Sequence, residues 1–136
     1  MPHDGVILAA DTAVVLDERV FGKPADEDDA VAMLTALSGQ THTVMTGVAV
    51  RSADSLHTAC SRTDVRFRAI DEDEMHRYWQ TGEPRDKAGA YAVQGLGGLF
   101  VESLAGSYSG VVGLPVYETA ELLRRVGLDV LQDFHG

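Results

Sequence analysis

The chain has 136 residues, 45% of them hydrophobic and 24% charged, which suits a single globular domain and excludes a largely disordered chain. Its formal net charge of −10 excludes a duplex nucleic-acid binder, which needs a basic surface, although a few cations gathered in one cleft would still bind a small anion. No apolar run reaches the roughly 18 residues of a membrane span, and the single cysteine cannot form an internal disulfide, so we expect a cytoplasmic protein without membrane segments.

The first predicted strand carries a carboxylate in its middle. Val6 to Ala10 is a continuous apolar run, typical of a strand covered on both faces, and the apolar pattern resumes after Asp11 and Thr12. An unpaired carboxylate buried there would cost several kcal/mol, so Asp11 needs a partner, a metal ion or a cleft. Two interpretations stay open from the residues alone. Asp11 either accepts hydrogen bonds from nearby backbone N–H groups in a turn, or it belongs to a functional site.

A helix is predicted between residues 26 and 38. Asp26 is a typical N-cap, the acidic residues that follow suit the positive end of the helix dipole, and the apolar residues from Ala30 to Leu37 form one stripe. We interpret the acidic cluster as a helix start rather than as a metal site. The loop before it, Gly22-Lys23-Pro24, carries one of the two lysines of the chain.

A long antiparallel hairpin is predicted next, from Thr41 to Arg51 and from Leu56 to Ala69. In the second half of the second strand, apolar and charged residues alternate cleanly, which places Arg66 and Arg68 on the outer face. We expect both arginines to be solvated rather than to bind phosphate.

A second helix is predicted from Asp71 to Thr81, again with an acidic first turn. The loop from Gly82 to Tyr91 is dense in charge and poor in bulky apolar residues, as functional loops often are. The glycine-rich run from Val93 to Gly98 is not a phosphate-binding loop, because no Gly-Lys-Ser/Thr signature follows it.

The C-terminal part is predicted to contain a strand from Leu99 to Leu104 and a last helix with an apolar face from Val116 to Val126. We expect one domain over residues 1–128 and a poorly ordered tail over residues 129–136.

Six segments, in this order along the chain, resemble the Maf family of nucleotide pyrophosphatases. They are Ala10-Asp11-Thr12-Ala13-Val14, Gly22-Lys23-Pro24, Ser38 to Gly47, Gly82 to Tyr91, Gln94-Gly95 and Val111 to Pro115. The resemblance implies an α/β fold in which a curved central mixed sheet is flanked by helices, with a cleft between two lobes.

The resemblance also implies an activity. We expect hydrolysis of a nucleoside triphosphate to the monophosphate and pyrophosphate, with Mg²⁺ or Mn²⁺ as the cofactor and a homodimer as the assembly. The loop from Asp86 to Tyr91, followed by Gln94, is similar to the branch that acts on dTTP and UTP.

Each motif implies a role for a particular residue. Asp11 would bind the metal ion or activate water, and Lys23 and Gln94 would complete the catalytic set. The residues implied in substrate binding are Thr12, Glu83, Asp86 and Lys87. These roles agree with the chemistry, because a triphosphate must be neutralised by a metal ion and lysines before water can approach phosphorus.

The sequence departs from the family at its start. Members carry a Ser-x-Ser-x-Arg-Arg loop, and then a glutamate and a lysine, before the strand that bears Asp11, and this sequence has none of them. We therefore expect the N-terminal strand and helices of the fold to be missing and turnover to be weak. The alternative is a catalytically impaired nucleotide-binding or regulatory protein. A stable α/β domain without a ligand is the least favoured interpretation.

Overall fold

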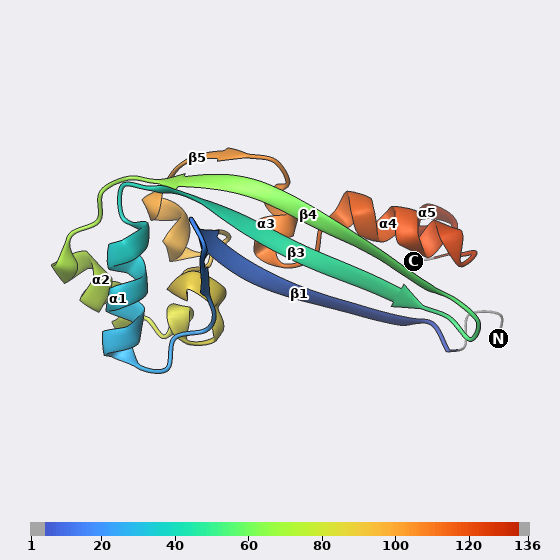
Figure 1. The fold of residues 1–136 in the computed structure, drawn as a ribbon, viewed down its shortest axis with the longest axis horizontal. Coiled ribbons are helices and arrows are strands. Elements are labelled where there is room, and N and C mark those ends of the chain that lie inside the picture. The colour runs from blue at the N-terminus through green and yellow to red at the C-terminus, as the bar shows by residue number, and fades with distance from the viewer. Residues whose placement is uncertain (1–4, 134–136) are drawn as a thin grey trace.

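The computed structural model describes residues 5–133, which form one sheet with helices packed along it (Figure 1). The strands are β1 (Ile7–Leu16), β2 (Arg19–Phe21), β3 (Thr41–Arg51), β4 (Leu56–Phe67) and β5 (Val101–Ala105), in the sheet order β2-β1-β3-β4-β5. The α-helices are α1 (Glu27–Leu37), α2 (Glu72–Gln80), α3 (Tyr108–Val112), α4 (Val116–Arg125) and α5 (Val130–Asp133). Three 3₁₀ helices, η1 (Glu83–Asp86), η2 (Ala88–Ala90) and η3 (Leu96–Phe100), lie between α2 and β5. Within these residues, no helix combines the length and the apolar character that a bilayer crossing requires.

The α/β class is confirmed, but the sheet is not mixed within the described residues. All four strand pairings are antiparallel. Short turns join β1 to β2 and β3 to β4, and such turns permit only antiparallel pairing, whereas a parallel pair needs a long crossover. The predicted hairpin is confirmed, with Thr41 opposite Arg66 and Arg51 opposite Leu56.

The helices form two groups along the long strands (Figure 1). One group, with α1, α2 and the 3₁₀ helices, packs at the end of the sheet where β2 and β5 lie. The main core there joins Leu34 and Leu37 of α1 to Val44, Val65 and Phe67 of the sheet. The other group, with α3 and α4, contacts β3 and β4, where Leu122 packs on Val48 and Val50.

The predicted helix starts are confirmed. The carboxylate of Asp26 accepts a hydrogen bond from the N–H of Asp29 at 2.8 Å. At α2, Asp71 and Glu74 form a reciprocal capping box, which satisfies two backbone donors that a helix start leaves unpaired.

Within the predicted tail, residues 130–133 form the one-turn helix α5. Leu128 just before it is buried and so fixes the start of this segment against the domain. The rest of the predicted tail, residues 134–136, lies outside the described part of the chain.

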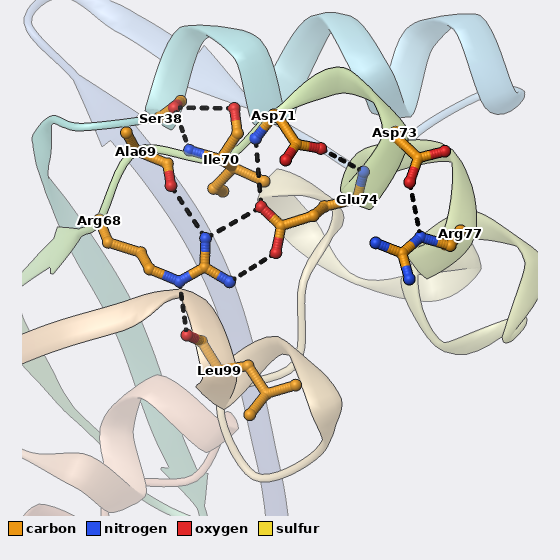
Figure 2. Close-up of polar contacts among 9 residues, drawn as sticks. All are labelled: Ser38, Arg68, Ala69, Ile70, Asp71, Asp73, Glu74, Arg77 and Leu99. Carbon is orange, nitrogen blue, oxygen red and sulfur yellow. Dashed lines mark hydrogen bonds and ion pairs between the residues drawn. The ribbon is translucent and has the colours of Figure 1, made fainter.

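The two arginines of β4 and its exit differ in their surroundings. Arg66 is half-exposed and pairs with Glu102, as a solvated arginine does. Arg68 is not simply solvated: its guanidinium makes a two-pronged contact with Glu74 at 3.0 and 2.8 Å and donates to the carbonyl oxygens of Ala69 and Leu99 (Figure 2). Arg68 therefore ties the start of α2 to the sheet and to η3.

The first half of β1 is exposed, although its apolar run predicted a strand covered on both faces. Ile7 is 59% exposed and Leu8 is 43% exposed. The reason is the sheet topology, because β2 pairs only with Val14 to Leu16 and leaves the rest of this β1 edge without a neighbouring strand among the described residues.

Candidate functional site

A cavity of about 470 Å³ lies between the two groups of helices. Its walls come from β1, from the β2–α1 loop, from the segment between η1 and η3, and from α3. Six of the seven predicted site residues line it: Asp11, Thr12, Lys23, Asp86, Lys87 and Gln94. The expected cleft between two lobes therefore corresponds to this cavity.

The open edge of β1 forms one wall. Five consecutive residues, from Ala10 to Val14, line the cavity. Since successive side chains of a strand point to opposite faces, this lining indicates that the cavity meets the edge of β1, and near Val14 it extends over the sheet to Val44 of β3. Asp11 is exposed there, and its carboxylate accepts a hydrogen bond from the backbone N–H of Thr12 at 3.0 Å. Asp11 thus lies inside a strand rather than at its end, and exposure removes the cost of burying its charge.

A backbone contact brings the two lysine-bearing loops together. The N–H of Gly89 donates to the carbonyl oxygen of Gly22 at 3.1 Å, which joins η2 to the loop that carries Lys23. Lys87 lies 3.6 Å from the carboxylate of its neighbour Asp86. The two cations, 64 residues apart in the sequence, therefore line the same cavity.

Replacing Gly89 by alanine is expected to lower the free energy of unfolding by about 1–3 kcal/mol. Gly89 has a φ of +71°, which alanine rarely adopts, and a Cβ there would lie 3.0 Å from a methyl group of Val14. Thermal unfolding measures the effect. The matched control is Gly22→Ala, because a Cβ at Gly22 meets no atom within 4 Å and its φ is not positive. Equal melting temperatures for the two variants would contradict the proposed strain.

Two threonines hold α3 against the sheet and so position a further wall of the cavity. The hydroxyl groups of Thr12 and Thr46 are 3.0 Å apart, and buried Thr46 donates to the carbonyl oxygen of Gly110 at 2.6 Å. This contact places Val111 and Val112 of α3 in the cavity lining.

Tyr91 also lines the cavity, and its role was not predicted from the sequence. Its hydroxyl lies 2.7 Å from Nε2 of His42, and both rings pack edge-to-face against Phe67. Both residues are buried, and burial lowers the pKa of His42 to about 4 although Asp64 opposes the shift, while burial raises the pKa of Tyr91. His42 lies two residues before Val44, so both side chains point to the buried face of β3. This alternation is the sequence signal that could have predicted a buried His42.

Glu83 is the predicted residue that does not line the cavity. Its carboxylate instead accepts hydrogen bonds from the hydroxyl of Tyr78 and from the N–H groups of Leu96 and Gly97. Burial alone would raise the pKa of Glu83, but these hydrogen bonds and the nearby charge of Lys87 hold it below its ordinary value. The carboxylate therefore stays ionised while it holds the backbone of η3.

The cavity offers oxygen donors for a divalent cation, but no complete cage. Within residues 5–133, no group of three or more histidine, cysteine, aspartate or glutamate side chains is arranged to hold a metal ion. The carboxylates of Asp11 and Asp86 and the hydroxyl of Thr12 are hard oxygen ligands. Mg²⁺ typically binds through one or two carboxylates, substrate phosphates and water, so the donor set fits a cation that arrives with a phosphate ligand.

Comparison with known proteins agrees with this arrangement. The family model of Maf-like proteins matches residues 1–126. A dTTP/UTP pyrophosphatase of Bordetella avium is 58% identical over 122 residues, which cover 90% of this chain and 61% of that protein. A dTTP/UTP pyrophosphatase of Methylococcus capsulatus is 54% identical over 127 residues, or 93% of this chain and 63% of that protein.

A third relative, a dTTP/UTP pyrophosphatase of Hahella chejuensis, is 51% identical over 131 residues, with 96% of this chain and 65% of that protein covered. The chain thus spans a little under two thirds of the length of these relatives. Because the family model extends over nearly the whole chain, including every residue of the cavity lining, the chain belongs to the family of Maf-like proteins.

Proposed function

We propose that this chain contributes the nucleotide site of a pyrophosphatase that hydrolyses dTTP and UTP to the monophosphate and pyrophosphate. The observation that carries the proposal is the convergence of Asp11, Lys23, Lys87 and Gln94 on one cavity from four separate segments. The cavity volume of about 470 Å³ lies within the usual range of small-molecule sites. The relatives named for dTTP and UTP support this choice of substrates.

The side chains have complementary tasks in such a reaction. Lys23 and Lys87 approach the cavity from two loops and would neutralise phosphate oxygens, which lets water approach phosphorus. Asp11, exposed on the β1 edge, would accept a proton from the attacking water or hold the cation. Gln94 would donate and accept hydrogen bonds with the nucleotide. A bound Mg²⁺ or Mn²⁺ would supply further neutralisation of the phosphate charge.

The direct test is release of pyrophosphate from a panel of nucleotides. The chain is incubated with dTTP, UTP, CTP, ATP and GTP, with and without Mn²⁺, and pyrophosphate is measured. We expect slow release that depends on the cation and is fastest with dTTP and UTP. Binding of UTP without any release would favour the nucleotide-binding alternative instead, and a preference for purine nucleotides would contradict the assigned substrates.

We further propose a cytoplasmic, homodimeric protein. The single cysteine, Cys60, supports a reducing compartment. The open β1 edge with exposed Ile7 and Leu8 supports association, because unpaired strand edges and apolar patches favour pairing. Sedimentation of the purified chain as a monomer at micromolar concentration would refute the dimer.

A further inference from the structure

The carboxylate of Glu83 accepts three hydrogen bonds from groups inside the protein. Oε1 accepts a hydrogen bond from the N–H of Leu96, and Oε2 accepts one from the N–H of Gly97, both at 2.9 Å. Oε2 also accepts from the hydroxyl of Tyr78, and the oxygen of that hydroxyl accepts from the N–H of Ala92 at 3.0 Å. One carboxylate and one phenol therefore hold the backbone on both sides of residues 93–95.

Two glycines make this close approach possible. A Cβ at Gly95 would overlap Oε1 of Glu83, and a Cβ at Gly97 would lie 2.7 Å from both the Tyr78 hydroxyl and the carbonyl oxygen of Ala92. The glycine-rich run from Val93 to Gly98, which carries no phosphate-loop signature, therefore allows the backbone to approach the carboxylate of Glu83 closely.

The contacts of Glu83 connect two segments of the cavity wall. Glu83 begins η1, and at the end of that helix the N–H of Lys87 donates to the carbonyl oxygen of Pro84 at 3.2 Å. On the other side, Gln94 lies between Ala92 and Gly97, the two outer backbone positions that Glu83 and Tyr78 hold. Glu83 therefore fixes the segment that carries Gln94 relative to the segment that carries Lys87.

The far end of η3 is held independently. Nε of Arg68 donates to the carbonyl oxygen of Leu99 at 3.1 Å, and the guanidinium is in turn bound by Glu74 (Figure 2). Because this end is tied to the sheet and to α2, loss of Glu83 would release residues 93–97 without detaching the whole of η3.

We propose that Glu83 is a positioning residue, which holds the turn of residues 94–97 so that Gln94 faces the nucleotide cavity beside Lys87. The expected effect of Glu83 on catalysis rests on the proposed function. Its expected effect on the conformation of residues 94–97 does not. A direct contact of Glu83 with the nucleotide is disfavoured, because the carboxylate does not line the cavity and its oxygens already accept three hydrogen bonds.

The test variant is Glu83→Gln, which keeps the size of the side chain but turns an N–H₂ donor toward backbone N–H donors. We expect the KM for UTP to rise by about tenfold or more, with a smaller change in kcat, because a charge-assisted hydrogen bond is lost at a loop that binds substrate. Tyr78→Phe removes the hydroxyl contact and is expected to shift KM in the same direction. The matched control is Glu121→Gln on α4, which removes only an exposed contact with Arg124 and should leave KM unchanged.

Two further measurements separate this proposal from the proposed function. If Glu83 acts through Gln94, the double variant Glu83→Gln/Gln94→Ala has the same KM as Gln94→Ala alone, and additive effects would overturn the proposal. Amide hydrogen exchange of Leu96 and Gly97 is expected to become about tenfold faster in Glu83→Gln while amides of β3 keep their rates. If the unmodified chain hydrolyses no nucleotide, the proposed function fails, and the exchange rates alone decide: faster exchange supports the positioning role, and unchanged exchange refutes it.

Discussion

The variant Asp11→Asn is expected to lower kcat for UTP by about 10³-fold, the usual effect of removing a general base or a charged ligand at the reacting centre. Asparagine has nearly the same shape, and its amide oxygen can still accept the hydrogen bond from the N–H of Thr12 that the carboxylate accepts now. The β1 edge should therefore keep its structure. Pyrophosphate release at saturating UTP and Mn²⁺ measures the loss, and thermal unfolding should show an unchanged melting temperature.

The matched control for this prediction is Asp86→Asn. Asp86 lines the same cavity and carries the same charge, but it is 75% exposed and lies 3.6 Å from the ammonium of Lys87. We expect its loss to lower kcat by at most about tenfold, because its carboxylate already pairs with Lys87 and Mg²⁺ can bind through a single protein carboxylate. Near-full activity of Asp11→Asn, or an equal loss in both variants, would refute the special role assigned to Asp11.

Local patterns were sufficient to predict most of the elements. The N-caps at Asp26 and Asp71 and the alternation in β4 depend on residues a few positions apart, and the structure confirms them. The strand predicted from Leu99 to Leu104 begins two residues later, at Val101, because the glycines before it form η3 instead. Gly97 packs there against Tyr78, a contact between residues that lie 19 positions apart and that no local pattern reveals.

The sequence predicted most of the residues that line the candidate site, but not how their side chains are arranged. The motifs identified six residues that line the cavity, yet they also suggested that Glu83 binds substrate, whereas its carboxylate faces the backbone of η3. The sequence pattern also placed Arg68 in solvent, although its partners Glu74 and Leu99 come from two other elements. In each case a charged side chain near a loop is ambiguous until the tertiary contacts of that loop are known.

The second prediction concerns acid stability and His42. Burial lowers the pKa of His42 to about 4, and the opposing effect of Asp64 does not compensate, while an unfolded histidine titrates near 6.5. Between these values the unfolded chain binds a proton that the folded chain does not. The contribution of His42 is therefore fully present above about pH 6.5 and is lost as the pH falls toward 4, by up to about 3 kcal/mol. Among the described residues, Nδ1 of His42 has no hydrogen-bond partner, so protonation also leaves a buried N–H unpaired.

Urea unfolding of the unmodified chain at pH 7 and pH 4.5 measures this loss, and His42→Phe/Tyr91→Phe is the informative variant. It replaces both hydrogen-bonded partners by apolar rings of similar shape, so it leaves no unpaired hydroxyl behind and removes the buried titrating group. Its stability should fall much less between the two pH values.

His76→Gln provides a control of opposite sign. The hydrogen bond to the carboxylate of Glu27 raises the pKa of His76, so this pair stabilises the fold below pH 6.5 and its contribution is lost as the pH rises through the raised pKa. Removing His76 should therefore make the loss of stability in acid steeper. If the unmodified chain and the double variant lose equal stability between pH 7 and pH 4.5, His42 is not the source of the acid loss. If His76→Gln loses less stability than the unmodified chain, His76 does not stabilise the fold in acid.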